Sequence, residues 1–201
     1  MWKHNQSTHA GEPSEQARPV VKNNKKRRKR ALTVREMTVF SMLGTMMYCS
    51  KLFLAWAPNI HLIALFIIVF TVVYRIKALV PIYVFVFLTG LLEGFSPWWV
   101  PYLYVWAILW GGVMLLPRRM SPKIAAPVYV ALGTLHGLLF GVFCAPSQAL
   151  FWGLDFKATL AWIAAGFYFD LLHGIGNFAA CTLALPLIML MRIIEKKGSV
   201  I

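Results

Sequence analysis

The chain has 201 residues, of which 59% are hydrophobic and 13% are charged, and its formal net charge is +13 at pH 7. Ordinary globular proteins carry about 25% charged residues, so this composition excludes a typical water-soluble domain and favours a protein dissolved largely in lipid. Nine of the twenty Lys and Arg lie between Lys3 and Arg30, ahead of the first apolar segment, so the charge does not indicate a basic folded surface that binds nucleic acid.

Residues 1–31 are polar and include a basic run at 25–30. They carry too little apolar surface to offset the entropy lost on folding, so we expect a disordered cytoplasmic tail. The basic run is interpreted as a signal that keeps the N-terminus inside, and a clamp for anionic lipid or RNA is the alternative. A cleaved signal peptide is not expected, because the polar stretch precedes the first apolar segment. Residues 198–201 are expected to form a short C-terminal tail.

Residues 32–197 contain apolar segments that predict an all-α integral membrane domain with six transmembrane helices. Thr33 and Glu36 have the spacing of a capping box, so the first helix should begin there. The predicted spans are residues 33–56, 60–74, 79–92, 100–116, 124–145 and 170–194. Residues 146–155 are predicted to form a loop. Residues 156–167 are predicted to form a short surface helix or the start of a long last helix.

The distribution of Lys and Arg sets the expected topology. With the N-terminus inside, cytoplasmic segments hold 18 of these residues, and only Lys51 and Lys157 lie outside. Without the first ten basic residues the split is still 8 to 2, the direction that the positive-inside rule requires. Both termini are therefore predicted to lie in the cytoplasm.

Polar and aromatic residues gather at the predicted outer ends of the helices. Asp170, His173 and Asn177 fall on one helical face, and ionisable groups at membrane depth tend to face a cavity or a partner. We expect them to contact a ligand. The alternative is that Asp170 is an N-cap and the other two hydrogen-bond between helices. The candidate substrate-binding residues are Asn59, His61, Glu93, Trp98, Trp99, Tyr102, Trp152, Asp170, His173 and Asn177.

His136 lies among Gly133, Gly137 and Gly141, which repeat every four residues in the fifth predicted span. Such small residues let another helix approach closely. We therefore expect His136 to be buried by packing and hydrogen-bonded, with a ligand contact as the alternative.

Signatures of catalysis and of metal binding are absent from the sequence. The three cysteines, Cys49, Cys144 and Cys181, lie in apolar runs without the paired spacing of a zinc or redox site. No metalloprotease, serine-hydrolase or phosphate-loop motif occurs, and no second carboxylate is spaced to act with Asp170. We therefore expect neither an enzyme nor a metal site, and an ATP-driven motor cannot be encoded in this chain.

The layout of residues 32–197 resembles the substrate-binding S component of energy-coupling factor (ECF) transporters. These are small six-helix membrane proteins of bacteria and archaea that capture vitamins or their precursors. The sharpest local similarity is Phe-Asp-Leu-Leu-His-Gly-Ile-Gly-Asn-Phe at residues 169–178, which resembles the start of the last helix in several such proteins.

The resemblance implies a pocket near the outer face, built from helices four to six and capped by the loops at residues 57–60, 93–99 and 146–155. It implies a multi-pass protein of the bacterial or archaeal plasma membrane that binds a small micronutrient. It further implies uptake powered by partners, namely an ECF T component and two ABC ATPase subunits that use ATP. This chain itself is expected to hold no cofactor and to bind no nucleic acid.

A small-residue face on the first predicted helix is the candidate docking surface for the T component. Ser41, Thr45 and Cys49 repeat every four residues with Gly44 beside them. S components typically carry an Ala-x-x-x-Ala-like face on this helix, and Ser41 and Thr45 occupy that spacing here without alanine. The face needs a close neighbour, within this protein or in another one.

Two other classes of protein remain open. One is an intramembrane enzyme that uses Asp170 and His173, and the other is a six-helix scaffold of the cell-shape machinery. The Trp- and Tyr-rich mouth with its carboxylates suits a flat heterocycle or a cation, through stacking and cation–π contacts.

Overall fold

The computed structural model describes Met1 and residues 32–57 and 59–198. Of the described residues, 81% are helical and none lies in a strand. The expected all-α class is therefore confirmed. The predicted tails at 1–31 and 198–201 lie outside the described residues, apart from Met1 and Gly198.

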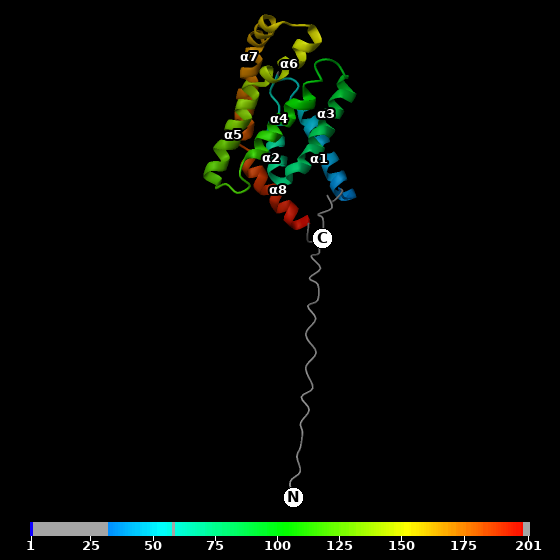
Figure 1. Ribbon diagram of the computed structural model, residues 1–201, viewed down its shortest axis with the longest axis vertical. Coiled ribbons are helices and arrows are strands. Elements are labelled where there is room, and N and C mark those ends of the chain that lie inside the picture. Colours follow the sequence, from blue (N-terminus) through cyan, green and yellow to red (C-terminus); the bar gives the residue numbers. More distant parts are fainter. Residues whose placement is uncertain (2–31, 58, 199–201) are drawn as a thin grey trace. The chain divides into compact units, whose positions relative to one another are not determined.

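The described part of the chain forms eight α-helices and one short 3-10 helix (Figure 1). In chain order these are α1 (Val34–Phe53), α2 (Ile63–Tyr74), η1 (Arg75–Ala78), α3 (Leu79–Glu93), α4 (Tyr102–Leu115), α5 (Pro122–Leu138), α6 (Phe140–Trp152), α7 (Phe156–Cys181) and α8 (Ala184–Gly198).

The start of α1 is the predicted capping box. The Thr33 hydroxyl accepts a hydrogen bond from the Glu36 amide at 3.2 Å, and the Thr33 amide donates to Glu36 Oε2 at 3.0 Å. Glu36 also forms an ion pair with Lys77, which precedes α3. The first turn of α1 is thus both capped and tied to its neighbour.

The chain reverses direction at Arg75, where φ is 56°. Tyr74 at the end of α2 packs edge-on against Phe40 near the start of α1, with ring centroids 5.0 Å apart. Glu93 at the end of α3 pairs with Lys51 at the end of α1. Consequently α2 runs antiparallel to α1, and α3 returns parallel to it.

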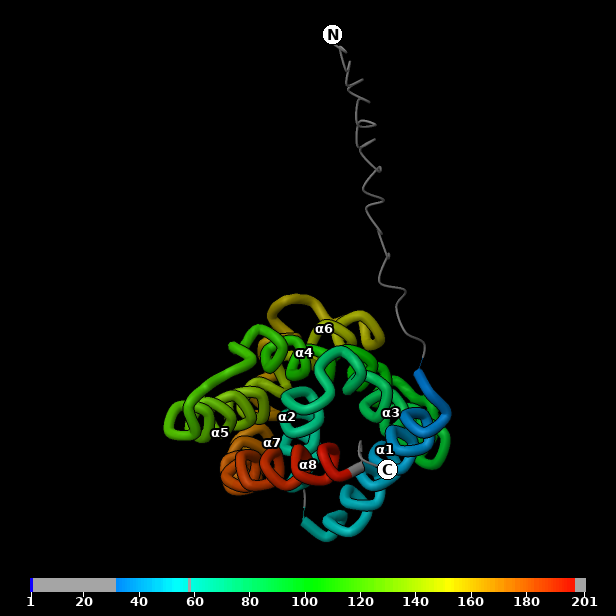
Figure 2. Tube along the Cα trace, turned by 90° about the horizontal axis from the view of Figure 1, so that it is seen from below, coloured from blue at the N-terminus to red at the C-terminus, as the bar shows by residue number. Residues whose placement is uncertain are grey.

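α2 occupies the centre of the bundle. Viewed along the helices, it is surrounded by α1, α3, α4, α5, α7 and α8 (Figure 2). Eight of its twelve residues are buried, as expected for a helix that is apolar on every side. The core therefore forms around α2, and the other helices each expose one face.

The predicted loop at 146–155 is wrong for most of its length, because α6 continues through Pro146 to Trp152. Proline is tolerated in such helices when neighbouring groups satisfy the backbone near it. Here the Tyr104 hydroxyl donates to the Phe143 carbonyl at 2.9 Å, and the Ser147 hydroxyl donates to the Cys144 carbonyl at 2.9 Å. The helix ends instead at Gly153, whose left-handed φ of 61° suits glycine.

The predicted last span at 170–194 is also wrong in its bounds. α7 begins at Phe156, where Asp155 caps it by accepting a hydrogen bond from the Ala158 amide at 2.7 Å, and it runs to Cys181. The expectation that 156–167 starts a long helix is confirmed. Pro186 explains the break before α8, because its ring clashes with the carbonyl four residues earlier.

Within the described part of the chain, three apolar helical stretches are long enough to cross a membrane, namely Ile63–Glu93 (α2, η1 and α3), Pro122–Trp152 (α5 and α6) and Phe156–Cys181 (α7). α4 is a shorter apolar helix. Only 17% of the most apolar window in α7 is buried inside the protein. An exposed apolar surface of this length is stable when lipid covers it, so the structure supports a membrane protein.

Candidate functional site

Three histidines and a tryptophan from four parts of the chain meet inside the bundle. His61 precedes α2, Trp106 lies on α4, His136 on α5 and His173 on α7. Ring centroids are 4.6 Å apart for His61 and His173, 5.9 Å for His61 and Trp106, and 5.7 Å for Trp106 and His136. We refer to these four residues as the His-Trp cluster.

Aromatic rings pack against the His-Trp cluster on two sides. Phe140, at the start of α6, lies 4.7 Å from His173 and 5.5 Å from Trp106 between ring centroids. Tyr102, one turn before Trp106 on α4, packs edge-on against it at 5.4 Å. The imidazoles are thus enclosed by ring faces and edges.

Several buried polar atoms of this region lack protein partners. Seven buried side-chain nitrogen or oxygen atoms have no hydrogen-bond partner in the described part of the chain, and five belong to the His-Trp cluster and Asn177. Those five are His61 Nδ1, Trp106 Nε1, His136 Nδ1, His173 Nε2 and Asn177 Oδ1. Since buried polar groups are nearly always hydrogen-bonded, such a concentration marks a place where something else supplies partners.

His136 is held in one tautomer. Its Nε2 lies 3.1 Å from the Val105 carbonyl oxygen on α4. A carbonyl oxygen only accepts, so Nε2 carries the proton and a neutral ring has an acceptor at Nδ1. The ring is 4% exposed, which confirms the expectation of a buried, hydrogen-bonded histidine. Its Nδ1 remains available.

His61 lies outside the helices, in the segment between α1 and α2. Burial, together with the nearby positive charge of Lys51, lowers the pKa of its imidazole from 6.5 to about 4. His61 is therefore neutral at pH 7.

Asn177 lies one turn beyond His173 on α7 and is 1% exposed. Its Nδ2 donates to the Gly133 carbonyl of α5 at 3.0 Å, which leaves Oδ1 as an acceptor without a partner. The alternative expectation of a hydrogen bond between helices is confirmed for Asn177. Its carbonyl oxygen is nevertheless unused.

The three glycines of the fifth predicted span divide between two helices, Gly133 and Gly137 on α5 and Gly141 on α6, and all three pack on α7. A Cβ added to Gly137 would lie 2.8 Å from Asn177 Nδ2 and 2.9 Å from Gly174 Cα, and one added to Gly133 or Gly141 would collide with Cys181 or Asp170. The helices therefore approach more closely than a larger residue allows. This contact brings His136 and His173 to the same interface.

Asp170 lies in the middle of α7, so the alternative that it caps the start of its own helix is wrong. Its Oδ1 accepts a hydrogen bond at 3.0 Å from the amide of Gly141, in the first turn of α6, and the residue is 6% exposed. A carboxylate at this position satisfies a free amide and complements the helix dipole. Asp170 thus stabilises the junction of α5 and α6 directly beside Phe140.

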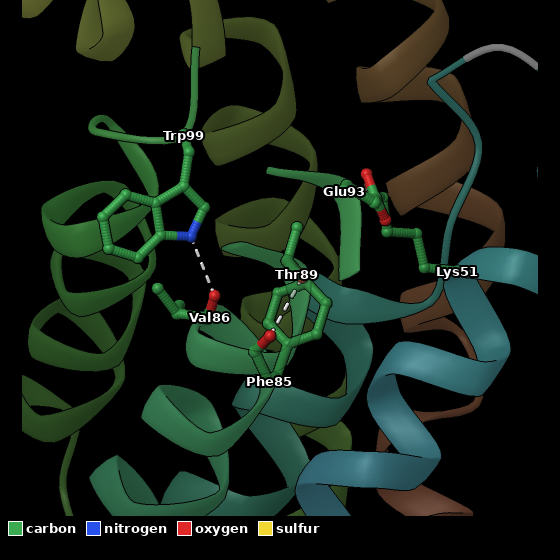
Figure 3. Close-up of polar contacts among 6 residues, drawn as sticks. All are labelled: Lys51, Phe85, Val86, Thr89, Glu93 and Trp99. Carbon is green, nitrogen blue, oxygen red and sulfur yellow. Dashed lines mark hydrogen bonds and ion pairs between the residues drawn. The ribbon is translucent and has the colours of Figure 1, made fainter. Parts of the chain in front are cut away.

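A charged pair lies at the end of the bundle where α1 and α3 end. Lys51 at the end of α1 forms an ion pair with Glu93 at the end of α3 at 2.6 Å (Figure 3). The ammonium group is 5.8 Å from the centroid of Trp98 and 6.0 Å from that of Tyr102. Because Tyr102 contacts Trp106, this charged pair is connected to the His-Trp cluster through a single ring.

The remaining candidates lie apart from the cluster. Trp99 donates its Nε1 hydrogen to the Val86 carbonyl at 2.8 Å and so packs on α3 (Figure 3). Trp152 is 65% exposed and bonds to Gln148 of its own helix. Asn59 is exposed and has φ of 57°. The structure thus brings together His61, Tyr102, His173 and Asn177, but not these three.

The candidate docking residues divide between two faces of α1. Gly44 faces α3, where an added Cβ would lie 2.7 Å from the Pro81 carbonyl oxygen. Ser41 and Thr45 are exposed, and the Thr45 hydroxyl donates to the Ser41 carbonyl at 2.9 Å. They lie on an exposed and mostly apolar face of α1 together with Val34, Met37, Thr38, Met42, Met46 and Cys49.

Sequence reasoning missed Trp106 and Phe140 as site residues. Trp106 lies one turn after Tyr102 in an aromatic-rich helix, where an indole is easily attributed to the membrane interface. The available signal was its spacing: Tyr102 and Trp106 fall on one face of α4. Only the packing of four elements shows that its N–H is buried.

No family model, curated protein or solved structure matches the chain. Within residues 32–57 and 59–198, no group of three His, Cys, Asp or Glu side chains is arranged to hold a metal ion.

Proposed function

We propose that this chain is the membrane-embedded substrate-binding subunit, of S-component type, of an ECF importer. It spans the membrane six times with both termini in the cytoplasm and captures a small micronutrient, such as a vitamin or its precursor, at the outer face. A T component and two ABC ATPases deliver the substrate into the cell. The chain binds the substrate and leaves hydrolysis of ATP to its partners.

One observation carries this proposal: the five buried polar atoms without protein partners, clustered among aromatic rings. A packed structural core avoids such atoms, because each lost hydrogen bond costs about 1–3 kcal/mol of desolvation. A small-molecule site is typically mostly apolar with a few convergent polar groups, as the His-Trp cluster is. A binding subunit accounts for this arrangement, whereas a scaffold would not need it.

The direction of the helices supports the six-span layout. Contacts at the two ends of α1 and α3 show that α2 runs opposite to both. Residues of the α1 start and the α8 end, including Glu36 and Met191, line one groove of about 830 Å³. The beginning and the end of the helical domain therefore lie at the same end of the bundle, as an even number of crossings requires.

Purification of the full chain in mild detergent, followed by mass spectrometry of small molecules released on denaturation, tests the proposal. A compound should be present in amounts close to one per protein, and its binding should weaken when Trp106 is replaced by Phe. Absence of any compound in protein from several growth media, together with no uptake defect on deletion, would refute a binding subunit. Turnover of a compound by the isolated protein would favour the enzyme class.

A further inference from the structure

A pocket of about 190 Å³ lies at the end of the bundle where α2 and α4 end and α5 begins. One part of its lining is apolar and the other part is polar. The apolar part comes from Val72, Val113, Leu116 and Pro117, and the polar part comes from Arg75, Arg118 and Tyr129. No carboxylate of the described residues lines this pocket, so its charge is positive.

Arg75 is held at the pocket by two contacts with α4. Its Nη2 donates to the Met114 carbonyl at 2.8 Å, and its own carbonyl accepts a hydrogen bond from Trp110 Nε1 at 3.2 Å. Its backbone has a φ of 56°, which a residue other than glycine adopts only where the surrounding structure holds it. The guanidinium is therefore fixed at the pocket and half-buried, rather than extended into water.

The protein satisfies only part of the Arg75 guanidinium. Its Nε is buried and has no hydrogen-bond partner among the described residues. Neither Arg75 nor Arg118 forms an ion pair with a described carboxylate. The negative end of the α4 dipole explains the bond to Met114, but a helix end carries only about half a charge. A half-buried cation thus lacks a counter-ion, which is unfavourable unless a ligand supplies one.

A third arginine lies near the pocket. The positive charges of Arg75 and Arg192 both act on the Tyr129 phenol, which places the Arg192 guanidinium of α8 close to the polar part of the lining. The starts of α1 and α5 and the end of α8 all lie at this end of the bundle (Figure 1). Basic groups from several elements therefore converge here.

The described carboxylates at this end of the bundle have other partners. Glu36 pairs with Lys77, and Glu195 accepts a hydrogen bond from the Tyr74 hydroxyl at 2.7 Å. Neither carboxylate lines the pocket. Within the part of the chain that the structure describes, the charge of the pocket is left for a ligand to neutralise.

The size and the lining of the pocket indicate the kind of anion. A cavity of about 190 Å³ is larger than one water needs and admits a tetrahedral oxyanion with a few attached carbons. Arginine guanidinium groups match the oxygens of a phosphate, while Val72 and Leu116 offer apolar surface to carbons beside it. Inorganic phosphate would leave that apolar surface in contact with water. A phosphate diester that carries carbon chains uses both parts of the lining.

We propose that the pocket around Arg75 binds the phosphate of an anionic phospholipid. Apolar helices end at this point, so lipid headgroups lie at the same depth, and basic pockets between membrane helices bind such headgroups. Arg75 and Arg118 contact the phosphate oxygens, and the Tyr129 hydroxyl donates to one of them. The inference does not depend on which solute the protein captures, because the pocket lies at the opposite end of the bundle from the Lys51–Glu93 pair.

Lipid titration of the full chain in detergent, followed by native mass spectrometry, tests the proposal. Phosphatidylglycerol carries an anionic phosphate diester, and phosphatidylcholine carries the same diester neutralised by choline. Glycerol 3-phosphate and inorganic phosphate, titrated by calorimetry, are the soluble probes. Salt at about 0.15 M screens long-range attraction by exposed basic residues. Phosphatidylglycerol should bind more tightly than phosphatidylcholine and than either soluble phosphate.

Two substitutions and a matched control locate the binding. Arg75→Gln removes the half-buried guanidinium and should weaken phosphatidylglycerol binding about tenfold or more, as expected for a hydrogen bond between charged groups. Arg118→Gln should weaken it about two- to fivefold, because Arg118 is exposed. Arg119→Gln removes the same charge from the next residue, which does not line the pocket, and should leave affinity unchanged. Arg118→Gln decides the case if Arg75→Gln fails to fold, since Arg118 makes no contact that folding requires.

The outcomes distinguish the site from its alternatives. Weaker phosphatidylglycerol binding in Arg75→Gln and Arg118→Gln, with Arg119→Gln unchanged, supports the proposal. Equal affinity of the wild type and Arg118→Gln, or equal losses in Arg118→Gln and Arg119→Gln, would show that the pocket is not the site. Tighter binding of a soluble phosphate than of phosphatidylglycerol, lost in Arg118→Gln, would show that the ligand is a free phosphate and not a lipid.

Discussion

At the scale of single residues, Asp170 is the candidate whose role in the structure differs most from the role predicted from the sequence. Its position among apolar residues indicated a ligand contact, and the structure gives it a backbone partner across a helix junction. The neighbouring His173, by contrast, keeps an unpaired Nε2 at 3% exposure. Adjacent polar residues on one helical face can thus serve different purposes.

The role of Asp170 predicts a difference between two substitutions. Asp170→Ala leaves the buried Gly141 amide without an acceptor and should lower the free energy of unfolding by about 1–3 kcal/mol. Asp170→Asn keeps an acceptor oxygen and should lose less than half of that. Unfolding monitored by tryptophan fluorescence in mixed detergent measures both. Equal stability of wild type and Asp170→Ala would show that the hydrogen bond contributes nothing.

Sequence pattern found those site residues whose polarity stands out from apolar surroundings. His61, His173 and Asn177 are visible in this way, and all three carry an unpaired buried atom. Trp106 is not visible, because an indole in an aromatic helix looks the same whether it faces lipid or the core. Its 1% exposure depends on packing against residues more than thirty positions away.

At the scale of helices, the sequence predicted a helix boundary correctly where the hydrogen bonds that fix it join residues close together in the chain. The capping box at Thr33 fixes the start of α1, because both of its hydrogen bonds lie within three residues. Pro146 misled the prediction, because α6 continues through it to Trp152. The packing of α6 against α7 and α4 cannot be read from a single stretch of sequence.

Close packing of α5 on α7 predicts opposite effects for two glycine substitutions. Gly137→Ala would place a Cβ 2.9 Å from the Gly174 backbone and should destabilise the protein by about 1–3 kcal/mol, as overpacking does. Gly166→Ala meets no atom within 4 Å and should be neutral or stabilising by up to about 1 kcal/mol, the helix-propensity gain. Thermal unfolding of the two variants compares them directly. A stabilising Gly137→Ala would mean that the helices are further apart than described.

At the scale of the whole molecule, the exposed face of α1 is the surface that the proposed function assigns to a partner. Ser41 and Thr45 lie four residues apart on that face, and neither contacts the His-Trp cluster. Under the proposed function, docking and substrate capture would therefore use different sides of the bundle and would be separable.

This separation predicts that Ser41→Leu with Thr45→Leu abolishes uptake and co-purification with ATPase subunits. Larger side chains prevent the close approach of another helix. Binding of the co-purified compound to the isolated variant should persist at wild-type affinity. Ala161→Leu with Ala165→Leu, on the exposed face of α7, is the control and should retain uptake. Loss of uptake in both double variants would point to a general effect on membrane insertion.

The orientation of the bundle gives the last prediction. Lys123 at the start of α5 and Lys157 at the start of α7 are both exposed, and the proposed topology places them on opposite sides of the membrane. After the exposed Cys49 is changed to Ser, single Lys123→Cys and Lys157→Cys variants differ only in the position of the new thiol. A membrane-impermeant maleimide added to intact cells should label Lys157→Cys at once, and should label Lys123→Cys only after the membrane is permeabilised.

Because both variants remove one positive charge, a change in orientation caused by that loss would affect them in opposite directions and would be visible as mixed labelling. Labelling of Lys123→Cys alone in intact cells would show that the topology is opposite to the proposed one. The Lys51–Glu93 pair and the His-Trp cluster near it would then lie toward the cytoplasmic side. Capture of a solute from outside would then be impossible through that end of the bundle.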